Sequence, residues 1–153
     1  MQINGKRATL RSTTSLVLTR QGCENITLKV ASVPVGINRD YEAIYPQPIP
    51  PTIVTNKAGG KVERERNYDD PKFIQQLSEY NYLRNIYIVV RVLECDSNVK
   101  FDNQPNSVDE LRAILQEMIE AGISEGDIAH ILEIALSISK ISSDDINTAK
   151  ESF

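Results

Sequence analysis

The sequence predicts an α+β protein with a small N-terminal β unit (a hairpin or small sheet), a proline-rich bridge, and a C-terminal cluster of about four α-helices. Three observations support this fold class. Residues 1–45 contain runs of β-branched residues, residues 46–67 contain closely spaced prolines and a glycine turn, and after residue 68 the apolar residues recur with the helical period. We therefore expect three units with the boundaries 1–45, 46–67 and 68–153.

A β-hairpin is expected in the first unit. Residues 16–19 and 26–33 are rich in β-branched side chains, and the turn-forming sequence Gln-Gly-Cys-Glu-Asn lies between them. In the second run, three apolar residues alternate with other types, which is the period of a half-buried strand; they are Ile26, Leu28 and Val30.

Four prolines fall within residues 46–51. Because proline fixes φ and lacks an N–H donor, this segment is expected to be neither helix nor central strand, but an extended polyproline II stretch. It acts either as a stiff linker pinned to its own domain or as a ligand for an aromatic groove of a partner. The candidate contact residues here are Tyr41, Tyr45, Pro48 and Pro50. Residues 55–67 are expected to form a glycine turn and a mobile polar run.

A long helix is predicted to start after Asp70, which is suited to cap it, with Pro71 at the first helical position. From Leu83 to Leu93 the helix is apolar on nearly all sides, which indicates a central element covered by the sheet and by later helices. Because residues 86–93 are rich in β-branched side chains, a strand is the alternative there, and we favour the helix.

Shorter helices follow with clear start and stop signals. Ser107 with Glu110, and Ser124 with Asp127, have the spacing of helix N-caps, and Gly122 ends the helix between them. A last short helix is expected after residues 142–145. The short connections predict a compact helical cluster.

Charge is distributed unevenly along the chain, whose net charge is −4. Residues 1–39 hold six Lys or Arg against one acid, and residues 107–153 hold three against ten acids. Ends of opposite sign attract each other within one chain, or between chains in a homo-oligomer. The bases are too thinly spread to predict nucleic-acid binding. We expect an acidic protein-contact surface on the helices, with Glu117, Glu120 and Glu125 as its candidates.

No catalytic, metal or cofactor site is predicted. His130 is the only histidine, the two cysteines (Cys23 and Cys95) are far apart, and no phosphate-binding or nucleophile motif occurs. The cysteines are expected to be reduced thiols, each filling a small apolar site. Neither a signal peptide nor a membrane-spanning run is found, so a cytoplasmic location without membrane binding is expected.

The order of these features resembles small proteins from the tail-morphogenesis region of tailed bacteriophages, a group that includes the tail assembly chaperones. The resemblance covers residues 41–153 and rests on three segments: the proline-rich bridge, the sequence Tyr-Asp-Asp-Pro-Lys-Phe at residues 68–73, and the closing acidic cluster from residue 121. It implies a non-enzymatic protein without a cofactor that binds a tape-measure or tail-tube protein in the host cytoplasm. A structural component of the virion, such as a head–tail or tail accessory protein, is the alternative.

Overall fold

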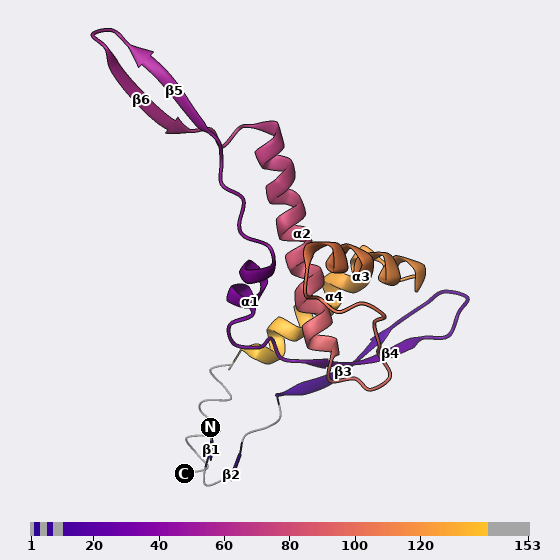
Figure 1. Ribbon diagram of the computed structural model, residues 1–153. Helices are drawn as coiled ribbons and strands as arrows, with labels where there is room; N and C mark the ends of the chain where they lie inside the picture. The colour runs from indigo at the N-terminus through magenta and orange to yellow at the C-terminus, as the bar shows by residue number, and fades with distance from the viewer. Residues whose placement is uncertain (1, 4–5, 8–10, 141–153) are drawn as a thin grey trace.

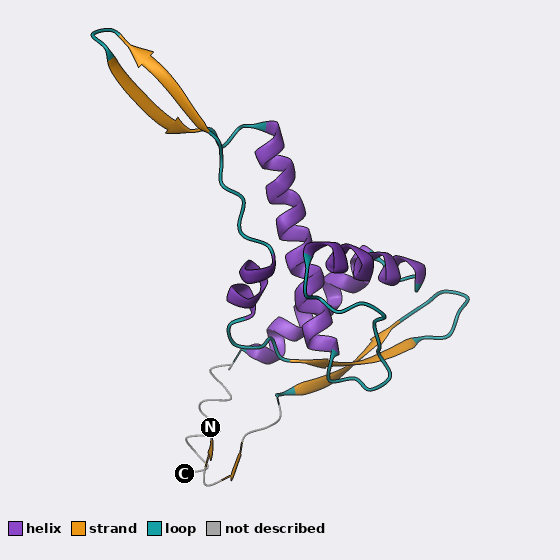
Figure 2. Ribbon diagram, viewed as in Figure 1, coloured by secondary structure: helices purple, strands orange, loops and turns teal. Residues whose placement is uncertain are grey.

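The computed structural model of the protein describes residues 2–3, 6–7 and 11–140. These residues form four helices and three two-stranded antiparallel sheets, which confirms the predicted α+β fold class. The long helix α2 (Pro71–Leu93) is the central element. Figures 1 and 2 show one hairpin near the C-terminal end of α2 and another that projects beyond its N-terminal end.

Each sheet pairs two successive strands. β1 (Gln2–Ile3) pairs with β2 (Lys6–Arg7), β3 (Thr13–Leu18) with β4 (Ile26–Ala31), and β5 (Thr52–Lys57) with β6 (Lys61–Arg66). The β3–β4 hairpin confirms the predicted one. Leu16 lies opposite Leu28, so both side chains point to the same face, and both are buried.

The helices begin where the sequence places their caps. The side chain of Asp70 accepts a hydrogen bond from the backbone N–H of Phe73 at 2.9 Å, and Pro71 opens α2. Ser107 caps α3 (Val108–Glu120), and Ser124 caps α4 (Glu125–Ser139). Residues 86–93 belong to α2, so the helix prediction is confirmed over the strand. A shorter helix, α1 (Ile37–Ile44), was not predicted.

The main core lies between the β3–β4 hairpin and helices α2, α3 and α4. It therefore joins buried residues from the predicted first and third units, and the division into three units stays a prediction. The main core consists of Leu16, Leu18, Leu28, Val30, Ile86, Val89, Val90, Val92, Leu93, Ile114, Met118, Ile128, Ile131 and Ala135. A second cluster, which fixes α1 to α2 and α3, consists of Ile37, Tyr41, Tyr80, Leu83, Tyr87 and Leu111.

The glycine turn predicted within residues 55–67 is confirmed, since Gly59 and Gly60 lie with positive φ in the three-residue turn of the β5–β6 hairpin. The polar run around it was not predicted to be β-structure, and its mobility stays a prediction. One prediction about the cysteines is wrong. Cys23 does not fill an apolar site, because it lies exposed in the turn between β3 and β4. The helix predicted after residues 142–145 lies outside the described residues. Among the helices described, none is long and apolar enough to cross a membrane.

Candidate protein-binding surface

The β5–β6 hairpin, residues 52–66, forms an arm that stands away from the body of the molecule (Figure 1). No helix or other strand in the described part of the chain packs broadly against it. All six residues of β5 are exposed, as is all of β6 except the half-exposed Glu63. A two-stranded hairpin alone is marginally stable in water. Along most of its length the arm therefore has no stabilising contact with the rest of the described chain.

The two faces of the arm differ in charge. Residues opposite one another share a face, and successive residues alternate. One face, which we call the basic face, carries the two valines Val54 and Val62 and the two arginines Arg64 and Arg66, with no acid. The opposite face carries two acids and two bases, and Lys57 and Glu63 form an ion pair there. Neither arginine on the basic face has a carboxylate partner among the residues described.

The base of the arm is held firmly. The backbone N–H of Asn67 donates to the carbonyl oxygen of Pro51 at 2.7 Å, which closes the hairpin where the chain enters and leaves it. Tyr68 then packs edge-to-face against Phe73, with ring centroids 6.2 Å apart. Because Phe73 is buried and its N–H is bound by the helix cap, the last residues of the arm connect directly to the rigid start of α2.

A groove of about 670 Å³ lies between this base, the proline bridge and the first turns of α2. Its rim exposes three large apolar side chains: Ile49 is 72% exposed, Tyr68 63% and Ile74 52%. Exposed apolar side chains gathered around a hollow are typical of protein-binding surfaces. We call this the basal groove; it is lined by Gln47, Pro48, Ile49, Pro50, Arg66, Tyr68, Phe73, Ile74 and Leu77.

The proline bridge is fixed to the body by tyrosines. The hydroxyl of Tyr41, whose side chain is fully buried, donates to the carbonyl oxygen of Tyr80 at 2.7 Å, and its ring also packs against Tyr87. Tyr45 donates to Glu79 at 3.4 Å. Burial raises the pKa of the Tyr41 phenol well above its usual value, so this hydroxyl stays protonated and able to donate. The bridge is thus anchored at its start, and its prolines, which fix φ, stiffen the wall that it gives the basal groove.

The predicted contact residues fall into separate places. Pro48 and Pro50 line the basal groove, although Pro50 is buried there. Tyr41 is a core residue and Tyr45 is half-buried beside it, and neither lines the groove. The sequence analysis did not identify Ile49, Tyr68 and Ile74 as site residues. The one feature that could have indicated them is that each is a large apolar residue beside prolines or beside the start of a helix.

The three predicted glutamates lie on α3 and α4, away from the basal groove. Glu117 accepts hydrogen bonds from the backbone N–H groups of Asp102 and Asn103 and from the Asn103 side chain, which anchors that loop. Burial disfavours its charged form, but these hydrogen bonds outweigh it and lower its pKa. Glu125 accepts from the hydroxyl of Tyr82 at 2.7 Å. Glu120 is exposed and accepts only from Gln116 of its own helix.

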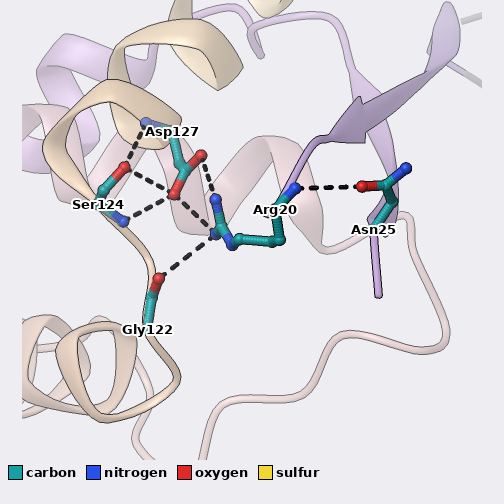
Figure 3. Close-up of polar contacts among 5 residues, drawn as sticks. All are labelled: Arg20, Asn25, Gly122, Ser124 and Asp127. Atoms are coloured by element: carbon teal, nitrogen blue, oxygen red, sulfur yellow. Dashed lines mark hydrogen bonds and ion pairs between the residues drawn. The ribbon is translucent and has the colours of Figure 1, made fainter. Parts of the chain in front are cut away.

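An arginine from the basic N-terminal region and an aspartate from the acidic C-terminal region, Arg20 and Asp127, form an ion pair within the same molecule. Figure 3 shows the Arg20 guanidinium donating to both carboxylate oxygens of Asp127, at 2.9 and 2.8 Å. Asp127 also accepts from the backbone N–H and the hydroxyl of Ser124, each at 2.8 Å, which completes a capping box at the start of α4. The hydrogen bonds from Arg20 hold the pKa of the Asp127 carboxyl well below its usual value. This pair ties the β3–β4 hairpin to α4.

His130 is exposed on α4, and within the described ranges no group of three His, Cys, Asp or Glu side chains is placed to hold a metal ion. Comparison of the chain with protein-family models, with curated proteins and with solved structures gives no match. The basal groove and the arm are therefore interpreted from their own geometry.

Proposed function

We propose that the protein is a non-enzymatic interaction protein that binds a partner protein in its basal groove. The observation that carries this proposal is the exposure of Ile49, Tyr68 and Ile74 around one hollow with a rigid wall. Apolar side chains at such a rim gain free energy when a partner covers them, at about 25 cal/mol for each Å² removed from water. A rigid wall lowers the entropic cost of binding, because little of the chain has to be ordered on contact.

The resemblance to tail-morphogenesis proteins suggests the class of partner. We propose a phage tail assembly chaperone that binds a tape-measure or tail-tube protein in the host cytoplasm, without a cofactor. A structural component of the virion is the second candidate, and the projecting arm favours it, since an element without contacts in its own chain suits an interlocking assembly. Purified mature particles distinguish the two, because a chaperone is absent from them and a structural component is present.

The binding proposal is tested by co-expression with a phage tail-tube protein and with a tape-measure protein. Ile74→Asp places a charge in the groove and should reduce capture of one of these proteins by about tenfold or more. Ile119→Asp is the matched control, since Ile119 also lies on a helix and is 56% exposed, against 52% for Ile74, but does not line the groove. Equal capture by both variants, or no capture by the parent protein, would contradict the proposal.

A further inference from the structure

The arm is basic and the rest of the chain is acidic. Residues 52–66 hold four bases (Lys57, Lys61, Arg64 and Arg66) against two acids (Glu63 and Glu65), a charge of +2. The whole chain carries −4, so everything outside the arm carries −6. The basic arm of one molecule is therefore attracted to the acidic body of another copy.

The outer face of α4 is an acidic and apolar surface. At its N-terminal end Glu125 accepts from the Tyr82 hydroxyl, whereas Glu133 has no hydrogen bond or ion pair among the described residues. Four residues at spacings of three and four lie along one side of this helix, and all are exposed: Glu125, Ala129, Glu133 and Leu136. The opposite side of α4, with Ile128, Ile131 and Ala135, is buried in the core. Leu136 is 51% exposed, and no Lys or Arg occurs within α4.

The two surfaces match in character and length. The basic face of the arm offers Val54 and Val62 beside two arginines, and α4 offers Leu136 one turn from Glu133, with Glu125 farther along the same side. Residues 62–66 span about 14 Å along a strand, and residues 125–136 span about 16 Å along a helix. In Figure 1 the arm projects beyond the N-terminal end of α2, whereas α4 lies in the body beside the C-terminal half of α2, so the two do not meet within one copy.

We propose that copies of this chain associate head to tail, with the basic face of the arm of one copy packed on the outer face of α4 of the next. Arg64 faces Glu133 in this arrangement, and the valines cover Leu136. Such a contact uses different surfaces on the two copies, so it produces a ring where the rotation closes and a filament where it does not. The inference goes beyond the proposed function, because neither Arg64 nor α4 lines the basal groove.

The test is the concentration dependence of molar mass, measured for the full chain by sedimentation velocity at low salt. The parent protein should exceed its monomer mass of 17.2 kDa as concentration rises, and should dissociate as salt is added. Arg64→Glu should weaken the association by about tenfold or more. Lys61→Glu is the matched control, since it makes the same change of charge in the same arm but on the opposite face, and it should associate like the parent.

A second variant keeps the test decisive if Arg64→Glu disturbs the arm itself. The single substitution Glu133→Arg, on α4, should also weaken association. The double variant Arg64→Glu with Glu133→Arg should restore the association of the parent. A parent that stays monomeric, equal behaviour of Arg64→Glu and Lys61→Glu, or a double variant without restoration would overturn the proposal. Capture of tail proteins through Ile74 is measured separately, so failure here is distinguishable from failure of the proposed function.

Discussion

Removing the arm should leave the stability of the body nearly unchanged. Thr52 and Arg66 lie directly opposite each other, and an Asn-Gly turn joins such a pair, so Asn-Gly can replace residues 53–65. The arm buries almost nothing against the body. The free energy of unfolding should therefore change by less than about 0.5 kcal/mol, and the Tm by less than about 2 °C.

Thermal unfolding followed by far-UV circular dichroism measures this change. Leu28→Ala is the comparison, since Leu28 lies in the β3–β4 hairpin and is only 8% exposed. That substitution should cost about 2–5 kcal/mol and lower the Tm by roughly 4–20 °C. If the arm replacement lowered the Tm as much as Leu28→Ala does, the arm would be packed against the body in solution, and the description of it as an unpartnered element would be refuted.

Three further predictions concern the body. Because the pKa of Asp127 is depressed, its contribution to stability is present above the ordinary carboxyl value of 3.8 and is lost as the pH falls below it. Asp127→Asn should therefore be less stable than the parent at pH 7, and the difference should shrink on acidification; a constant difference in urea midpoint would contradict this. Tyr41→Phe should cost about 0.5–1.5 kcal/mol by removing one buried hydrogen bond, and an unchanged urea midpoint would argue against that bond. Residues 68–153 expressed alone should be helical but less stable, since the β3–β4 hairpin no longer covers α2; a random-coil spectrum would show that the chain is one inseparable domain.

The elements predicted correctly from the sequence are those with one buried face or a defined cap. Alternation in residues 26–30 indicated a half-buried strand, and β4 buries Leu28 and Val30 as expected. Asp70, Ser107 and Ser124 each cap a helix, because a short polar side chain before an apolar run satisfies free N–H groups in any fold.

The arm was missed because neither of its faces is buried. Hydrophobic alternation arises only where one side of a strand meets a core, and the arm has charged residues on both faces. Its available signal was the β-branched run at residues 52–55 before Gly59 and Gly60. The basal groove was missed for a related reason, since it forms only when the proline bridge is brought beside α2 by the buried ring of Tyr41.

The most direct test of the proposed function is amide hydrogen exchange of the protein, free and in complex with the partner protein that the proposal predicts. Burial of the basal groove should slow exchange in residues 66–77, which form its base and its helical wall. Exposed parts of α3 such as the region of Glu120 should exchange at the same rate in both states. Slowed exchange confined to α3 and α4, with residues 66–77 unchanged, would contradict the account.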